Sequence, residues 1–188
     1  MEIRTFIAVE LEPSLQQFLK IIQSNLKPLN LDVSWVKPEN IHITLRFLGE
    51  IPLKKVKAIS EIFPDIFKEF RPFEIKLSGL GVFPKIERPN VIWVGIDQGS
   101  QEMKGLAESL ENALCRLGYP KEHREFKAHL TLGRIRSLKN CELLAKAIAD
   151  YSPKETIRQT VHSIVFFKST LSPQGSLYEP LATTRLSS

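Results

Sequence analysis

The chain has 188 residues, of which 43% are hydrophobic and 25% charged, and its formal net charge at pH 7 is +5. This length and composition predict one domain over residues 1–188, with two lobes around one core, and exclude a largely disordered protein. The positive charge suits a polyanionic partner without requiring one. No apolar run approaches the roughly 20 residues that span a bilayer, and charged residues stand where a signal peptide has its apolar core, so we expect a cytoplasmic protein without membrane contact.

Apolar residues alternate in the segments that we predict as strands and recur every three or four residues in those that we predict as helices. In the first half these patterns predict strands at 3–11, 33–36 and 41–49, a helix from Ser14 to Pro28, and a helix after Leu53 that Pro64 should kink or split. In the second half they predict strands at 73–83 and 91–96 around a polar loop, helices at 101–117 and 140–149, a strand from Ala128, and closing strands at about 156–169 and 177–181.

This order of elements lacks the strict alternation of strand and helix that builds parallel sheets. It favours an α+β fold in which two antiparallel sheets face each other across a central cleft, with the helices outside. Each half of the chain pairs a long helix with a strand and a further helix. We therefore expect an internal duplication with a pseudo-twofold axis.

One short pattern occurs once in each half. The two copies are Ile-His-Ile-Thr-Leu at 41–45 and Ala-His-Leu-Thr-Leu at 128–132. Because side chains alternate between the faces of a strand, His42 and Thr44 share one face, as do His129 and Thr131. At average residue frequencies one such pattern is expected in a chain of this length with a probability on the order of one in a hundred, and two far less often. We interpret the two copies as halves of one catalytic site.

Two histidines and two threonines on facing strands suit the hydrolysis of a phosphodiester. Imidazole titrates near pH 6.5, so one histidine can act as base toward water while the other, protonated, acts as acid toward the departing sugar oxygen. Hydroxyl groups of Thr44 and Thr131 would stabilise negative charge on the phosphate oxygens, and such donors can be worth about 3 kcal/mol each.

Two arginines are candidates for binding the phosphate. Arg46 lies on the strand face of His42 and Thr44, where its alternative role is a surface ion pair. Arg134 falls on the opposite face from His129 in a regular strand, and a bulge at Gly133 would return it to the groove.

The paired motifs resemble the signature of the 2H phosphoesterase superfamily. Three further segments are similar to the RNA 2′,3′-cyclic phosphodiesterases, also called 2′-5′ RNA ligases: Arg46-Phe47-Leu48-Gly49-Glu50, Gly133-Arg134 and Arg4-Thr5-Phe6-Ile7-Ala8-Val9. The resemblance covers essentially the whole chain and implies a bilobal α+β fold with the histidines in a central cleft. It also implies hydrolysis of RNA 2′,3′-cyclic phosphates to 2′-phosphates and a reversible 2′-5′ joining of RNA, with no metal.

The family resemblance further implies that His42 is the proton donor to the 3′-oxygen and His129 the proton acceptor for water. The residues alone leave these two roles interchangeable. We expect a monomer without cofactors that acts on RNA ends, with tRNA fragments among the candidates.

Other classes of function compete with this one. The four histidines form no His-x-x-x-His or His-x-His pair, which disfavours a metal-dependent hydrolase. A non-catalytic RNA-binding module is the first alternative, because exposed aromatic rings stack on bases. The aromatic candidates are Trp35, Phe47, Phe83 and Trp93. A phosphodiesterase for small cyclic-phosphate nucleotides is the second, although the basic segments 121–127 and 85–88 favour RNA.

Overall fold

The structure is a computed structural model that describes residues 1–151, 157–173 and 175–187. Its elements in chain order are β1 (Glu2–Val9), α1 (Pro13–Leu26), the 3-10 helix η1 (Lys27–Leu29), β2 (Val33–Trp35), the 3-10 helix η2 (Pro38–Asn40), β3 (Ile43–Pro52), α2 (Leu53–Phe67), β4 (Phe73–Lys85), β5 (Arg88–Ile96), α3 (Ser100–Arg116), β6 (His129–Ile135), α4 (Cys141–Asp150), β7 (Arg158–Val161), β8 (Ser163–Ser172) and β9 (Gly175–Arg185). Among the described helices none is long and apolar enough to cross a membrane.

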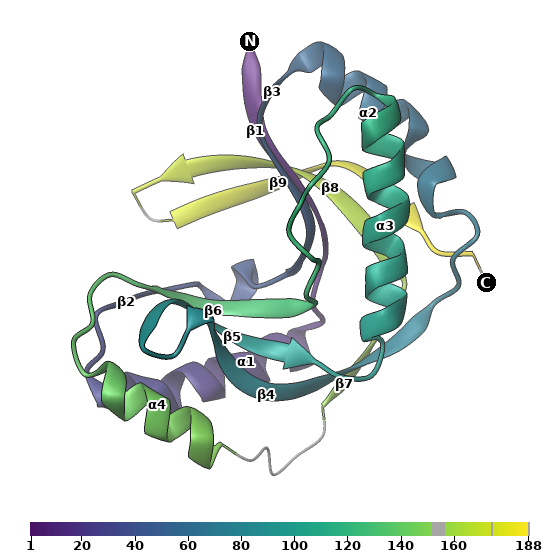
Figure 1. Ribbon diagram of the computed structural model, residues 1–188. Helices are drawn as coiled ribbons and strands as arrows, with labels where there is room; N and C mark the ends of the chain where they lie inside the picture. The colour runs from purple at the N-terminus through teal and green to yellow at the C-terminus, as the bar shows by residue number, and fades with distance from the viewer. Residues whose placement is uncertain (152–156, 174, 188) are drawn as a thin grey trace.

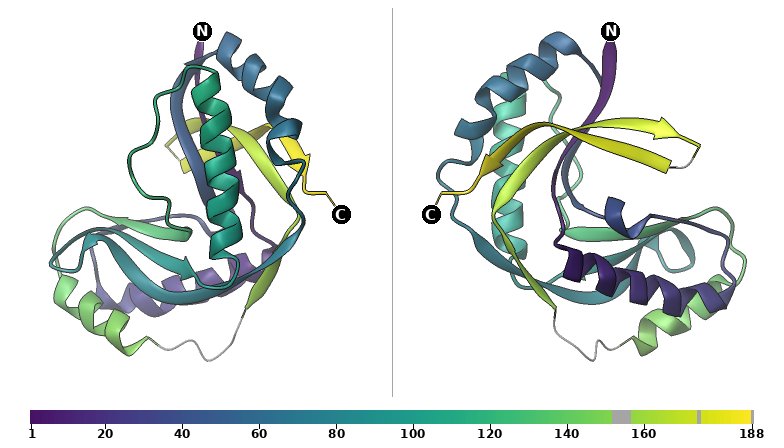
Figure 2. Two further views of the ribbon diagram at one scale, coloured as in Figure 1. Left: turned by 45° about the vertical axis from the view of Figure 1, so that its right-hand side comes forward. Right: turned by 180° about the vertical axis from the view of Figure 1, so that it is seen from behind.

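The strands form one antiparallel sheet in the order β7-β4-β5-β6-β3-β1-β8-β9, and β2 lies along β6. The sheet curls so that its two halves, β7-β4-β5-β6 and β3-β1-β8-β9, turn toward each other (Figures 1 and 2). They join where β3 meets β6, with Ile43 opposite Leu130. The predicted α+β fold with antiparallel sheets is therefore confirmed, and the two predicted sheets are continuous at this pair.

Helices cover the outside of the sheet, as predicted. Helices α2 and α3 contact each other, with α2 on β9 and α3 on β3, whereas α1 and α4 lie below the half that contains β4, β5 and β6 (Figure 1). Helix α1 begins at Pro13, whose fixed φ suits the first turn of a helix. Its apolar face is buried in the main core through Leu15, Leu19, Ile22 and Leu26.

Three local predictions were wrong. Helix α2 continues through Pro64 to Phe67, so the split that was one of the two predicted effects of Pro64 does not occur; Phe63 and Phe67 are buried on either side of it. The predicted loop at 84–90 is a tight hairpin in which Lys85 pairs with Arg88. Strand pairing uses backbone N–H and C=O groups, so polar side chains in this segment do not prevent it. The start of the strand predicted at about 156–169 lies outside the described residues. The rest is interrupted at His162, which separates β7, paired with β4, from β8, paired with β1.

Candidate active site

The strands that carry the two motifs meet at the centre of the sheet. Ile43 pairs with Leu130 and both are fully buried. One step to either side of this pair, antiparallel register directs Thr44 toward His129 and Thr131 toward His42. All four side chains are half-buried on the face opposite to the buried aliphatic residues. The structure thus brings together the four residues that the sequence singles out for catalysis.

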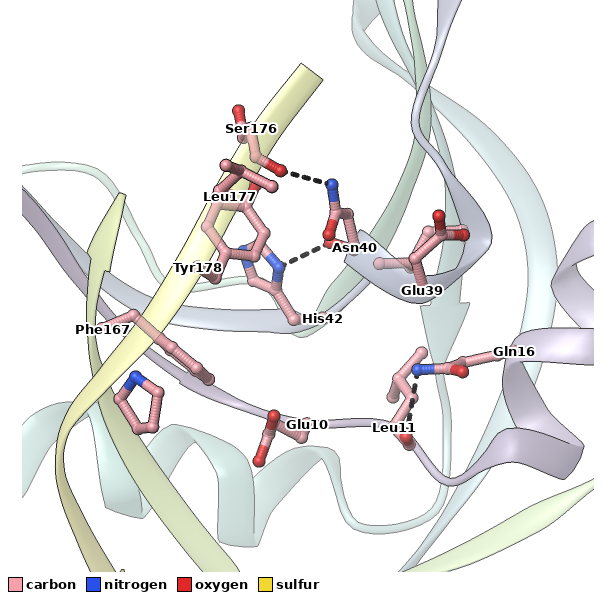
Figure 3. Close-up of a pocket in the computed structure, with 12 residues that line it drawn as sticks. Glu10, Leu11, Gln16, Glu39, Asn40, His42, Phe167, Ser176, Leu177 and Tyr178 are labelled. Carbon is pink, nitrogen blue, oxygen red and sulfur yellow. Dashed lines mark hydrogen bonds between the residues drawn. The ribbon is translucent and has the colours of Figure 1, made fainter. Parts of the chain in front are cut away.

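His42 is held from two sides. Its Nδ1 lies 2.8 Å from the backbone oxygen of Asn40, and its ring stacks on Phe6 at 4.6 Å between centroids. The edge of Tyr178 approaches the same ring at 5.4 Å. Asn40 in turn donates its side-chain Nδ2 to the backbone oxygen of Ser176 at 2.8 Å, which ties the turn before His42 to β9 (Figure 3).

His129 has the same kind of support in the other half. Its Nδ1 lies 2.6 Å from the backbone oxygen of Lys127, and Phe83 and Trp93 approach its ring at 5.0 and 6.5 Å between centroids. A carbonyl oxygen only accepts hydrogen bonds, so Nδ1 carries the proton in both histidines when they are neutral. The Nε2 atom of each ring is consequently the one that can exchange a proton with a bound molecule.

The electrostatic environment lowers the pKa of both histidines. Burial has the largest effect on His42 and lowers its pKa; the bond to the Asn40 oxygen opposes this, and the charge of His129 lowers the pKa further. For His129, burial again lowers the pKa most, the Lys127 oxygen raises it, and the charge of Arg134 lowers it. The two imidazoles therefore interact electrostatically within one site, and Arg134 acts on the second of them.

Arg134 reaches the side of His129 because β6 is irregular. The register of β6 against β5 shifts between Thr131 and Gly133, which leaves Leu132 as an extra residue. Leu132 and Gly133 are both buried, so the alternation resumes with Arg134 exposed. Glycine is required there because a Cβ on Gly133 would lie 2.5 Å from Cγ1 of Val33.

Arg46 lies two residues after Thr44 but is engaged by other protein groups. Its Nη1 is 2.8 Å from Oε2 of Glu122, its Nη2 donates to the Pro120 oxygen at 3.0 Å, and its Nε is 3.4 Å from Oε2 of Glu111. Only 13% of the side chain is exposed. The structure therefore shows the ion-pair alternative for this arginine, in a largely buried form.

Two cavities flank the histidines. One of about 300 Å³ is bounded by His42, Tyr178, Phe167, Glu10 and Glu39 (Figure 3). The other, of about 540 Å³, lies between α3 and the segment before β6 and includes Thr44 and His129 in its wall. The charged side chains in that wall are of both signs: the basic ones are Arg46, Lys104, Lys121, Arg124 and Lys127, and the acidic ones are Glu108, Glu111, Glu122 and Glu125. Within the described part of the chain, no three His, Cys, Asp or Glu side chains converge as metal ligands would.

Several supporting residues were not predicted from the sequence. Phe6 and Tyr178 around His42 carry no local signal, because they come together only through the pairing of β1, β8 and β9. Asn40 lies two residues before His42, in η2. Gln23 on α1 does carry one, since a polar residue interrupts the apolar stripe between Leu19 and Leu26. Its Nε2 donates to the backbone oxygens of Val36 at 2.7 Å and Leu132 at 2.9 Å.

Comparisons with known proteins identify the family of this chain. The family model described as LigT like Phosphoesterase matches twice, at residues 9–93 and 94–178, so each motif lies in one repeat. The RNA 2′,3′-cyclic phosphodiesterase of Methanothermobacter thermautotrophicus is 32% identical over 99% of this chain and 100% of its own. That of Archaeoglobus fulgidus is 36% identical over 95% of this chain and 97% of its own.

Solved structures share the fold. A protein of Thermus thermophilus has a TM-score of 0.79 at 25% identity, with 97% of both chains covered. E. coli LigT complexed with 3′-AMP has a TM-score of 0.78 at 24% identity, with 100% of both chains covered. The two repeats confirm the predicted internal duplication, and the chain belongs to the LigT-like phosphoesterase family.

Proposed function

We propose that this protein hydrolyses terminal RNA 2′,3′-cyclic phosphates to 2′-phosphates by acid-base catalysis with two histidines and without a metal ion. The observation that carries the proposal is the pair His42 and His129. Each has its Nδ1 committed to a backbone oxygen, and the charge of one acts on the pKa of the other. Curated relatives with the name RNA 2′,3′-cyclic phosphodiesterase, which align over nearly the whole chain, support this substrate class.

In the proposed reaction, Nε2 of neutral His129 takes a proton from a water molecule as its oxygen attacks the phosphorus. The bond from phosphorus to the 3′-oxygen breaks, and protonated His42 gives its proton to that oxygen. The product is a 2′-phosphate monoester beside a 3′-hydroxyl, and proton exchange with solvent restores both histidines. Hydroxyl groups of Thr44 and Thr131 donate to the phosphate oxygens, and Arg134 supplies positive charge beside His129. The role of Arg46 as a phosphate clamp stays a prediction.

The same arrangement supports a reversible 2′-5′ ligation. A 5′-hydroxyl that replaces water beside His129 would give its proton to Nε2 of His129 and attack the cyclic phosphate. The bond from phosphorus to the 3′-oxygen would break, with a proton from His42 going to that oxygen, and a 2′-5′ linkage would form. The larger cavity lies on the His129 side, where the attacking strand must approach, and its volume of about 540 Å³ leaves room for that strand beside Thr44 and His129. We propose that the substrates are RNA ends, among them those of tRNA fragments. We also propose that the enzyme is a monomer.

The test uses an RNA oligonucleotide with a terminal 2′,3′-cyclic phosphate, incubated with the protein in excess EDTA. We expect a 2′-phosphate product, identified by chromatography against 2′- and 3′-phosphate standards. Replacement of either histidine, in His42→Ala or His129→Ala, should reduce kcat by about 10²–10⁴-fold. His162→Ala is the matched control, because His162 is exposed at the link between β7 and β8.

Four results would contradict the proposal. A 3′-phosphate product would mean that the wrong bond breaks, and loss of activity in EDTA would indicate a metal ion. RNA affinity without turnover, unchanged in the double histidine variant, would instead identify a binding module. Faster turnover of a 2′,3′-cyclic mononucleotide than of the RNA, judged by kcat/KM, would replace RNA by a small nucleotide as the substrate.

A further inference from the structure

The segment that leads into the second histidine motif has little backbone support. Residues 117–128 form neither helix nor strand. In the described chain, the loop backbone bonds to other backbone groups at Leu117, Gly118 and Tyr119, and residues 120–127 make no such bond. Yet this segment includes Lys127, whose carbonyl oxygen orients the ring of His129. Something other than the backbone must therefore hold the segment in place.

Side chains from two neighbouring elements provide that support. Arg46 of β3 contacts both the carboxylate of Glu122 and the carbonyl oxygen of Pro120. Glu111 of α3 accepts a hydrogen bond from the backbone N–H of Glu122 at 2.7 Å and lies beside Arg46 Nε. The second oxygen of Glu122 accepts the backbone N–H of Arg124 at 3.2 Å. A network of charge-assisted contacts thus ties the segment to β3 and α3 at Pro120 and Glu122, and Arg124 is bonded to Glu122 within the segment.

One guanidinium faces two carboxylates in this network, and two of the three side chains are largely withdrawn from water. The Arg46 and Glu111 side chains are 13% and 16% exposed. The backbone N–H of Arg124, with help from the Arg46 charge, holds the pKa of Glu122 below its ordinary value, so Glu122 is a carboxylate at neutral pH. Removal of one partner leaves the other charges without compensation, which favours release of the segment into solvent.

We propose that Arg46 is a positioning residue: through Glu111 and Glu122 it fixes residues 119–127 and thereby the orientation of His129. The inference rests on the proposed role of His129 in proton transfer. It couples the two halves of the site, because Arg46 extends the strand of His42 and Thr44 while it anchors the approach to His129. A guanidinium that already contacts two carboxylates is also a poor partner for an anionic phosphate.

Two variants separate this role from a phosphate clamp. Arg46→Met removes the guanidinium, and Glu122→Gln keeps it but removes the charge of one of its two carboxylate partners. A positioning role predicts that each variant lowers kcat by about 10–100-fold with KM within a few-fold, as for other residues that orient catalytic groups. The double variant should be no worse than the worse single variant, because both changes break one network. A clamp predicts instead that Arg46→Met raises KM and that Glu122→Gln, which frees the guanidinium, leaves kcat intact or improves binding.

A measurement on the free protein tests the orientation without any assay of activity. Imidazole ¹⁵N chemical shifts, recorded above pH 7 where His129 is neutral, report which ring nitrogen carries the proton. The unmodified protein should show His129 with the proton on Nδ1, and both variants should show a mixture of the two tautomers. His42 is the internal control, because its partner Asn40 lies outside the network.

Matched controls come from a second ion pair. Arg158 and Glu74, 2.9 Å apart on β7 and β4, are remote from the histidines, so Arg158→Met and Glu74→Gln should change neither kcat nor the His129 shifts. An unaltered His129 tautomer in both Arg46→Met and Glu122→Gln would overturn the inference even if the protein proved to have no phosphodiesterase activity. Conversely, a tautomer mixture together with no turnover by the unmodified protein would retain the network and reject the proposed function.

Discussion

The buried amide of Gln23 gives a quantitative test of how the sheet around the site is held together. Only 2% of Gln23 is exposed, and its Nε2 bridges the carbonyl oxygens of Val36 and Leu132. Gln23→Met keeps the length of the side chain and removes both hydrogen bonds. The Leu132 oxygen still accepts a hydrogen bond from the N–H of Val36 at 2.9 Å. Loss of its bond to Gln23 therefore costs only about 0.5 kcal/mol, the low end for a hydrogen bond. The Val36 oxygen loses its bond to Gln23 in a partly buried position, which costs about 1–3 kcal/mol.

The sum is a decrease of about 1.5–3.5 kcal/mol in the free energy of unfolding, or about 3–14 °C in Tm for a chain of this size. Urea unfolding followed by circular dichroism measures the first quantity, and calorimetry the second. Gln17→Met is the control, because Gln17 is exposed on the same helix, and it should stay within about 0.5 kcal/mol of the unmodified protein. If Gln23→Met is no less stable than this control, the bridge contributes nothing and the reasoning is wrong.

Two further predictions concern activity. Burial lowers the pKa of both histidines, and activity needs one of them neutral and the other protonated. The bell-shaped profile of kcat/KM against pH should therefore peak below pH 6.5, and a peak above pH 7.5 would contradict this. Arg134→Met should move one limb of the profile to higher pH, because it removes a charge that lowers the His129 pKa. Thr44→Val and Thr131→Val should each lower kcat about 10²-fold with unchanged Tm, since each removes a donor from a half-exposed position. A lost donor should lower kcat by about 10²-fold. If steady-state kinetics show a change of less than about threefold in kcat, the threonines do not donate to the phosphate in the transition state.

Local pattern was sufficient for much of the fold. The two-residue period of β3 determines that His42 and Thr44 lie opposite Ile43 and Leu45, and the structure shows that alternation of burial. The apolar stripe of α1 likewise determines the face that the helix buries. The repeated motif was also visible in the sequence. Because of this repeat, one shared site could be proposed for His42 and His129, which are 87 positions apart.

The tertiary structure decided which elements became neighbours. Strand pairing depends on contacts between residues remote in sequence, and a period of two says which face a side chain occupies but not which strand lies beside it. The sequence left two roles open for Arg46. The packing of α3 against β3 brought Glu111 to it, and the loop after α3 brought Glu122. Long-range packing also accompanies the irregularity at Leu132. Strand β2 packs closely on Gly133, next to the extra residue in β6 that places Arg134 on the face of His129. Short-range periodicity thus specified the residues of the site, and long-range packing specified their partners.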